Sequence, residues 1–158
     1  MNKISRKVIA VLLMAVCFLA TIGSATVYAY PGQMQVKVLD QSDRSTKYSI
    51  LYTSTKHWDG KRFGYKATIP LTVVVRKSPS NETYYFSSQD YSTIQITPKI
   101  SKQTFTVKND KCKKINKTFF SITADVIDEL PGYSTGHSLL RVNFHVNPQT
   151  GQITAEDK

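Results

Sequence analysis

Residues 65–76, Tyr-Lys-Ala-Thr-Ile-Pro-Leu-Thr-Val-Val-Val-Arg, alternate apolar and polar side chains along almost their whole length. One side of this segment, if extended, carries only apolar residues, namely Ala67, Ile69, Leu71, Val73 and Val75. The other side carries Thr68, Pro70, Thr72 and Arg76, interrupted only by Val74. A period of two predicts a β-strand with one buried face and one solvent-facing face. Because strands buried on both faces are continuously apolar, the alternation favours an antiparallel sheet.

Shorter alternating segments recur along the chain, at residues 34–38, 48–52, 83–86, 94–98, 105–107, 120–126, 140–146 and 152–154. Turn-forming or charged residues separate them, so we expect surface connections at residues 40–46, 54–64, 77–82, 87–90, 108–117 and 128–136. Pro98 should end its strand or place it at a sheet edge. The sequence therefore predicts an all-β fold, a single antiparallel β-sandwich or small barrel of about 8–9 strands, after an N-terminal signal helix.

The first 29 residues have the three parts of an export signal. Residues 1–7 carry three positive charges, residues 8–23 are continuously apolar, and small residues follow, with Val27 and Ala29 at the positions that a signal peptidase reads. We expect cleavage after Ala29 and a single all-β domain over residues 30–158. The protein is then secreted, or associated with the cell envelope, without a stable membrane span.

Two alternatives to a cleaved signal are open. No charge occurs between Val8 and Tyr30, a length that could span a bilayer as an uncleaved anchor, although the apolar character falls after Leu19. Cys17 could be the lipidated residue of a lipoprotein signal, but Val16 stands where a small residue is expected. Cleavage after Ala29 fits the sequence better than either.

Charge and cysteine content narrow the class of protein. The chain has 158 residues and a formal charge of +10; residues 1–29 hold three of its 21 bases and none of its 11 acids, so the remaining 129 residues carry +7. Such an excess favours attraction to polyanions. Cys112 is then the single remaining cysteine, which excludes an internal disulfide. Small secreted eukaryotic domains usually hold several disulfides, so we expect a Gram-positive-type bacterial product.

Asn147-Pro-Gln-Thr-Gly151 resembles the Asn-Pro-x-Thr sorting signals that sortases cut to attach proteins to bacterial cell walls. Such a signal is followed by an apolar membrane segment and a basic tail, whereas residues 152–158 are short and polar. Asparagine, proline and glycine in this order are typical of a tight turn. We therefore predict a turn here.

The most distinctive basic segment is residues 108–117, predicted to be an exposed hairpin loop, and its lysines are Lys108, Lys111, Lys113, Lys114 and Lys117. Lysine suits phosphate groups held without fixed geometry. Teichoic acids and anionic lipid headgroups are the abundant polyanions of a Gram-positive envelope, and each lysine near an anionic surface contributes on the order of 1 kcal/mol. Trp58, with Lys61 and Arg62, forms a possible second binding patch.

A catalytic alternative uses polar residues on one predicted strand face. If the strand before residue 146 is straight, His145 shares a face with Arg141 and Asn143, and Asp125 and Thr123 lie on a neighbouring strand. The candidate acid–base residues are His145, Arg141, Asp125 and His137. A secreted nuclease or phosphodiesterase would gather such groups around a phosphate.

The predicted function is binding without catalysis, to an anionic envelope polymer, to lipid headgroups or to a protein partner. The alternatives are the small secreted hydrolase, for which the candidate side chains must converge in one cleft, and a secreted toxin or inhibitor acting through residues 54–64. The three histidines, His57, His137 and His145, lack metal-ligand spacing, so we expect no metal, no cofactor and no nucleic-acid partner.

Overall fold

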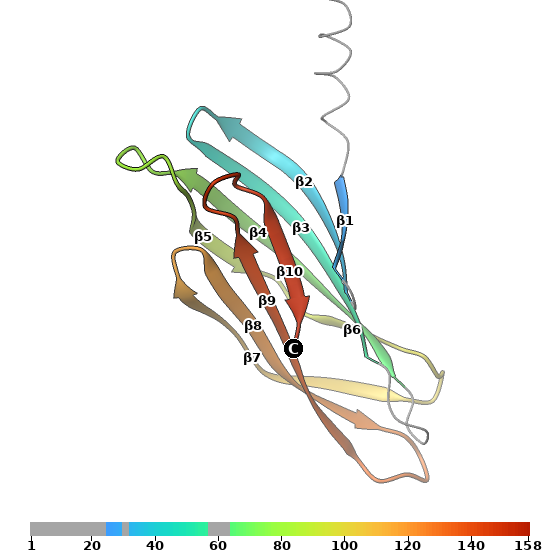
Figure 1. Cartoon of the computed structure of the whole chain (residues 1–158). Coiled ribbons are helices and arrows are strands. Elements are labelled where there is room, and N and C mark those ends of the chain that lie inside the picture. The colour runs from blue at the N-terminus through green and yellow to red at the C-terminus, as the bar shows by residue number, and fades with distance from the viewer. Residues whose placement is uncertain (1–24, 30–31, 57–63) are drawn as a thin grey trace, which may run out of the picture.

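Two antiparallel sheets make up the computed structural model, which describes residues 25–29, 32–56 and 64–158. Sheet A has the order β1-β2-β3-β4-β5, with β6 also paired to β4, and sheet B has the order β10-β9-β8-β7 (Figure 1). The strands of sheet A are β1 (Ala25–Ala29), β2 (Gly32–Ser42), β3 (Ser45–Lys56), β4 (Tyr65–Lys77), β5 (Tyr84–Tyr91) and β6 (Gln95–Pro98). Those of sheet B are β7 (Thr104–Asn116), β8 (Phe119–Glu129), β9 (Gly136–Val146) and β10 (Ile153–Asp157). The described residues contain no helix, which confirms the all-β prediction.

Strand β4 lies at the centre of sheet A and has the alternation predicted for residues 65–76. Its five predicted inward residues are all buried, and Tyr65 extends the buried face by one position. Strand β3 pairs with residues 65–76 along one edge of β4. Along the other edge β5 pairs with residues 71–77 and β6 with residues 65–68, so the two short strands follow one another. Pro98 ends β6, as predicted.

The two sheets share one core, in a sandwich-like arrangement. Buried apolar residues of β2 to β5 pack with those of β8, β9 and β10 in a single cluster. Aromatic rings join the sheets: Phe86 of β5 meets Phe120 of β8 at 4.9 Å between ring centroids, and Tyr52 of β3 meets Phe144 of β9 at 5.6 Å. Both contacts are edge-to-face, the geometry that aromatic quadrupoles favour.

Strands extend into several of the expected connections, although residues 43–44 do form a turn. Residues 40–42 continue β2, residues 87–90 continue β5, and the lysine-rich residues 108–116 belong to β7, where a loop was predicted. The physical reason is the same in each case. Backbone pairing with a neighbouring strand outweighs the turn preference of polar residues, and their exposed side chains remain hydrated. The connection predicted at residues 128–136 is shorter, because β8 continues to Glu129 and β9 begins at Gly136.

Several predictions concern residues outside the described ranges. Residues 1–24, for which the signal helix is predicted, and residues 57–63, with Trp58, Lys61 and Arg62, lie outside them. Within the segment expected to be cleaved, Ala25–Ala29 forms β1, which pairs with Gly32–Val36 of β2. Cleavage after Ala29 stays a prediction.

The turn predicted at Asn147–Gly151 is confirmed. The Asn147 side-chain oxygen accepts hydrogen bonds from the backbone N–H groups of Gln149 at 2.9 Å and Thr150 at 3.2 Å, and its carbonyl accepts the N–H of Gly151 at 2.8 Å. Gly151 has φ +74°, the left-handed conformation that glycine adopts without penalty. This turn reverses the chain from β9 into β10, which pairs back on β9 as expected.

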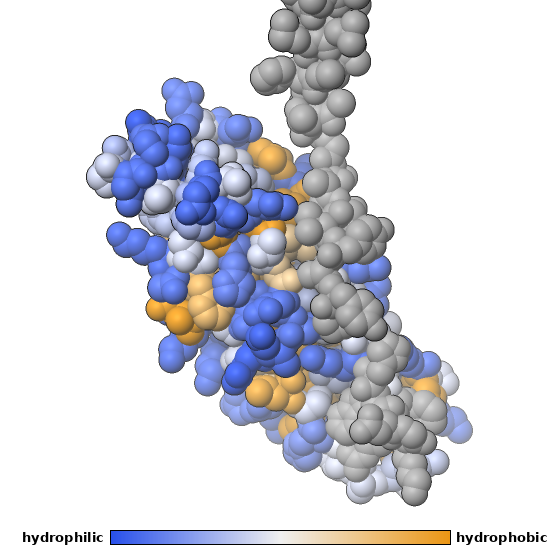
Figure 2. Space-filling view, viewed as in Figure 1, coloured by the Kyte–Doolittle hydropathy of each residue, from blue (hydrophilic) through white to orange (hydrophobic). Residues whose placement is uncertain are grey.

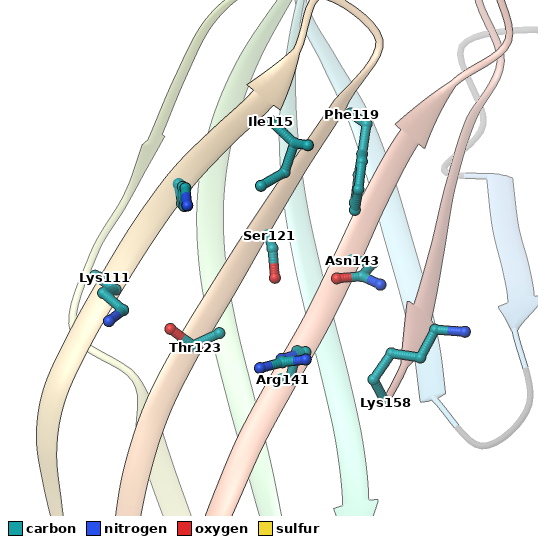
Figure 3. A pocket seen from close by; sticks show the side chains of 9 residues that line it. Lys111, Ile115, Phe119, Ser121, Thr123, Arg141, Asn143 and Lys158 are labelled. Carbon is teal, nitrogen blue, oxygen red and sulfur yellow. The ribbon is translucent and has the colours of Figure 1, made fainter.

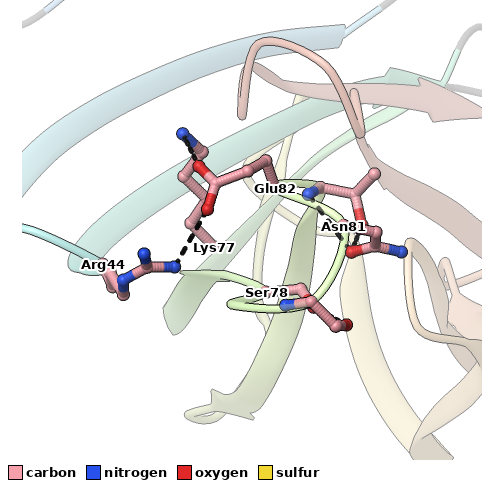
Figure 4. A network of polar contacts seen from close by, with 7 residues as sticks. Arg44, Lys77, Ser78, Asn81 and Glu82 are labelled. Carbon is pink, nitrogen blue, oxygen red and sulfur yellow. Dashed lines mark hydrogen bonds and ion pairs between the residues drawn. The ribbon is translucent and has the colours of Figure 1, made fainter.

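The turn between β4 and β5 is held by ion pairs (Figure 4). Glu82, whose backbone has φ 55°, forms an ion pair with Lys77 of the same hairpin. It forms a second ion pair, at 3.2 Å, with Arg44 in the β2–β3 turn. Asn81 accepts hydrogen bonds from the backbone and hydroxyl of Thr83. The two turns are therefore linked at one end of sheet A, although exposed ion pairs of this kind stabilise weakly.

A polar contact ties β10 to sheet A across the core. Asp157 accepts a hydrogen bond from the Tyr52 hydroxyl at 3.0 Å and another from the Ser54 hydroxyl at 2.7 Å, and both donors are fully buried. Burial, and then the negative charge of Asp157, raise the pKa of Tyr52 well above its usual 10.0. Gly32 packs against the Tyr52 ring so closely that a Cβ at this position would overlap the hydroxyl.

We predict that Tyr52→Phe destabilises the protein by about 1 kcal/mol near pH 7, because Asp157 loses a donor. Above pH 10, the free energy of unfolding of this variant should fall less steeply with pH than that of the native protein. There the unfolded chain releases the tyrosine proton while folded Tyr52 keeps it, so native stability falls as pH rises, by up to about 1.4 kcal/mol per pH unit for this group. Urea unfolding between pH 7 and 11 measures both effects, with the exposed Tyr133→Phe as control. An unchanged alkaline slope in Tyr52→Phe would contradict this assignment.

Gly151→Ala should be more destabilising than Gly132→Ala, although both glycines have positive φ, +74° and +85°. At Gly132 a Cβ has open space, so we expect only the conformational penalty of about 1–2 kcal/mol. At Gly151 the Cβ would lie 2.9 Å from the Tyr84 ring, which should add at least about 1 kcal/mol of overpacking. The free energies of unfolding in urea measure the difference, and equal values for the two variants would show that Tyr84 moves aside freely.

Candidate functional site

The outer face of sheet B carries a groove of about 480 Å³ across strands β7, β8 and β9. Its position follows from strand register, because residues opposite one another on neighbouring strands project to the same face. In one row across the sheet Ser121 lies between Lys113 and Asn143, and in the next row Thr123 lies between Lys111 and Arg141. The groove is lined by these six residues with Ile115, Phe119 and Lys158 (Figure 3).

A β-bulge in β7 directs its lysines into this groove. From Lys108 to Lys111 β7 advances three residues, while β8 advances two from Asp125 to Thr123. The extra residue inverts the alternation. Before the bulge the odd-numbered residues of β7, Phe105 and Val107, pack on the core; after it the even-numbered Cys112 faces the core and the odd-numbered Lys111 and Lys113 face outward.

Both residues within the bulge have side-chain partners. Asn109, with φ 52°, donates a hydrogen bond to Asp125 of β8 at 2.7 Å. Asp110 accepts one at 3.0 Å from the hydroxyl of Tyr91, which lies in sheet A. Burial and this contact raise the pKa of Tyr91 to about 12. The bulge is therefore fixed to a neighbouring strand on one side and to the opposite sheet on the other.

The groove is electropositive. Its lining contains four cationic side chains, Lys111, Lys113, Arg141 and Lys158, and no Asp or Glu. Glu156, which does not line the groove, pairs with Lys158 at 3.3 Å and accepts a hydrogen bond from Asn143, also at 3.3 Å. The hydrogen bonds from Asn143 and Lys158 hold the pKa of Glu156 below its usual value. Lys111, Lys113 and Arg141 have no carboxylate partner among the described residues.

Two hydroxyl groups on the floor of the groove have no hydrogen-bond partner among the described residues. They are Ser121 Oγ and Thr123 Oγ1, both inaccessible to solvent, and Ser121 as a whole is 8% exposed. Buried polar groups in folded proteins are nearly always satisfied, so an unpaired one requires an explanation. In Figure 3 the Ser121 side chain lies in the middle of the ring of labelled residues.

The five lysines of the basic segment are separated by the structure. Lys111 and Lys113 line the groove, and Lys108 lines a second groove of about 420 Å³ on the same face of sheet B. Lys114 instead reaches across to sheet A, where its Nζ donates to the carbonyl of Phe86 at 2.8 Å. Lys117 lies in the β7–β8 turn with its Nζ 6.0 Å from the centre of the Tyr85 ring. The segment is thus not one flexible charged loop.

His145, Arg141 and Asp125 share the outer face of sheet B, as the sequence predicted. His137, expected in the loop before the strand of His145, instead lies on that strand, β9, and the four residues do not form a cluster. The His145 ring stacks on the Phe119 ring with 4.4 Å between ring centroids, and His145 Nε2 lies 3.7 Å from Glu156 Oε1. Arg141 lines the first groove, whereas Asp125 and His137 line the second. Among the described residues no hydrogen bond or ion pair joins any two of these four.

Sequence reasoning placed Asn143 and Thr123 on this face but missed Ser121 and Lys158. Ser121 alternates with the core residues Phe120 and Ile122, so its outward direction was readable from the sequence. Its burial was not, because that depends on the side chains of the adjacent strands. Lys158 lies beyond the last predicted strand, residues 152–154, but its backbone N–H donates to the carbonyl of Arg141 at 3.0 Å.

Cys112 is half-buried on the inner side of β7, opposite Ile122. Burial raises the pKa of its thiol, and the carboxylate of Asp90 raises it further. Neighbouring lysines favour the thiolate of an exposed cysteine, but the Cys112 side chain packs against the core while Lys111 and Lys113 face away from it.

We predict that Cys112 reacts with a maleimide at pH 7.5 more slowly than free glutathione does, because less of it is thiolate and access is restricted. Asp90→Asn should accelerate the reaction, since removal of the negative charge lowers the thiol pKa. Asp43→Asn, in the distant β2–β3 turn, is the matched control. A native rate equal to that of glutathione would contradict the buried placement.

Other kinds of site have little support in the described residues. Within residues 25–29, 32–56 and 64–158 no group of three or more His, Cys, Asp or Glu side chains is placed to hold a metal ion. No helix in these ranges has the length and apolarity needed to cross a membrane. In comparisons with protein family models, with curated proteins and with solved structures, the chain matches none.

Proposed function

We propose that this is an exported, non-enzymatic binding protein of a Gram-positive-type bacterium, which holds an anionic polymer of the cell envelope on the outer face of sheet B. The observation that carries the proposal is the grouping of Lys111, Lys113 and Arg141 around one groove without a carboxylate in its lining. A polyanion contacting the three cations gains on the order of 1 kcal/mol from each at modest salt.

Further features of this face favour a polymer over a compact ligand. The second groove, with Lys108 and Asn109 in its lining, lies farther along the same strands. Lys108, Lys111 and Lys113 therefore succeed one another along the outer side of β7, at the edge of sheet B. The face of the molecule drawn in Figure 2 is largely hydrophilic, with only separate hydrophobic areas. An extended anionic chain lying along β7 would meet these cations in sequence.

Export is compatible with this site. Cleavage after Ala29 would remove β1, which pairs with β2 in sheet A. The groove is built from β7, β8 and β9, with Lys158 following β10, and these strands form the other sheet. A β-sandwich of residues 30–158 would thus keep its binding face. The patch of Trp58, Lys61 and Arg62 stays a prediction, because these residues lie outside the described ranges.

We predict that replacing Lys111 and Lys113 together with Gln weakens binding to a purified glycerol-phosphate wall polymer by about 10- to 30-fold at low salt. The variant should also depend less steeply on salt, because fewer counterions are exchanged when fewer cations bind. Retention of the protein on immobilised polymer across a salt series measures both quantities.

The matched control replaces Lys47 and Lys66 with Gln. Both are exposed, and both lie on the outer face of sheet A, so the net charge changes equally. Equal losses in the two double variants would mean that charge alone, without a site, holds the polymer. Binding to vesicles of anionic lipid but not to the polymer would replace the polymer with a membrane surface.

A further inference from the structure

The floor of the groove contains hydrogen-bonding groups that simple charge attraction does not need. Ser121 and Thr123 are two residues apart on β8 and project to the same face, so their Cα atoms are about 7 Å apart. Each hydroxyl can donate one hydrogen bond, and neither has a partner among the described residues.

The cations are arranged around the same point. Lys113 lies beside Ser121, while Lys111 and Arg141 lie on either side of Thr123. Flexible lysines adjust to an oxyanion, and the planar guanidinium of Arg141 can offer it two parallel donors. A phosphate group held between the two hydroxyls would therefore meet positive charge on both flanks.

Asn143 adds a hydrogen-bond acceptor to this set of donors and cations. Its Nδ2 donates to Glu156 Oε1 at 3.3 Å, and because a carboxylate at neutral pH only accepts, this contact fixes which end of the amide is the nitrogen. The amide oxygen is then turned toward Ser121 and the groove (Figure 3). An oxygen acceptor repels a bare anion but accepts a hydrogen bond from a hydroxyl group. A ligand that satisfies this floor carries an O–H beside its phosphate.

We propose that the groove is a discrete site for one phosphate group carried on a polyol, a step that rests on the proposed function and specifies its ligand. Binding displaces the side chains that cover Ser121 Oγ and Thr123 Oγ1 in the free protein, and the two hydroxyls then donate to phosphate oxygens. Lys111, Lys113 and Arg141 neutralise the charge, and Asn143 Oδ1 accepts from a polyol hydroxyl. Ile115 and Phe119, at one end of the groove, face the carbon chain. Such a unit occurs both in polyol-phosphate polymers and in glycerol-bearing lipid headgroups.

The probe is glycerol 3-phosphate, titrated into the full chain and followed by calorimetry, with inorganic phosphate and acetate alongside. We expect saturable binding in the order glycerol 3-phosphate, inorganic phosphate, acetate. Ser121→Ala combined with Thr123→Val should weaken glycerol 3-phosphate binding about 10-fold without changing its salt dependence, because no charge is removed. The corresponding pair on the outer face of sheet A, Ser49→Ala with Thr72→Val, should leave binding unchanged.

Asn143→Leu is the variant that tests the polyol contact. It should reduce the preference for glycerol 3-phosphate over sulfate, a tetrahedral anion without an O–H at neutral pH, while leaving sulfate binding, titrated in the same way, nearly intact. The Ser121/Thr123 variant must also stay folded, and we expect its melting temperature to be no lower than that of the native protein, since the deleted hydroxyls have no protein partner. A lower melting temperature would show that these hydroxyls are already bonded in the free protein and would overturn the proposal.

The outcomes separate the two levels of the proposal. If Lys111→Gln with Lys113→Gln releases the polymer but the hydroxyl variant binds glycerol 3-phosphate normally, the phosphate site is wrong and the polymer-binding function stands. If neither variant changes binding, both are wrong. Glycerol-phosphate polymer and vesicles containing phosphatidylglycerol, compared at equal phosphate, identify the source: vesicle binding alone would keep the phosphate site and overturn the polymer.

Discussion

The fold depends on contact between the apolar faces of two sheets, and aromatic rings carry that contact through the middle of the molecule. Within sheet B the rings of Phe120 and Phe144 stack with 4.9 Å between their centroids. Phe120 also contacts Phe86 of sheet A, and Phe144 contacts Tyr52 of sheet A. Neither sheet could bury its apolar face alone, so each needs the other. Every strand that contributes a ring must keep its alternation in phase, because a shift of one residue would turn that ring toward water.

The same requirement explains how the outer face of sheet B, with its groove, forms. Strand β7 begins with Phe105 and Val107 packed on the core, and an uninterrupted strand would send Lys111 and Lys113 inward as well. Burying two unpaired ammonium groups is strongly unfavourable. The bulge at Asn109 and Asp110 removes this conflict: it brings Cys112 to the core and sends both lysines to the outer face. Hence the site follows from a local irregularity that the core makes necessary.

This irregularity also marks how far the sequence can be interpreted. The strict alternation at residues 65–76 predicted β4 to within one residue at its end, because apolar burial alone determines such a strand. Turn chemistry similarly predicted Asn147–Gly151. Residues 108–116 have neither signal: their polarity indicated a loop, whereas pairing with β8 makes them a strand. The partner strand lies across a turn, and no local pattern in the lysine-rich segment announces where the bulge falls.

The site residues likewise differ in how much of their placement the sequence predicted. The shared face of Asn143, Arg141 and Thr123 was predictable, since a period of two assigns each residue of a strand to one side. That Ser121 lies beneath the side chains of two neighbouring strands depends on the register of β7 against β8 and of β8 against β9, which no single segment encodes. A hydroxyl buried there without a partner lowers native stability, and like charges two residues apart on β7 repel one another. Local compromises of this kind are typical of surfaces that bind ligands, because a ligand that supplies the missing acceptor and the opposite charge relieves both at once.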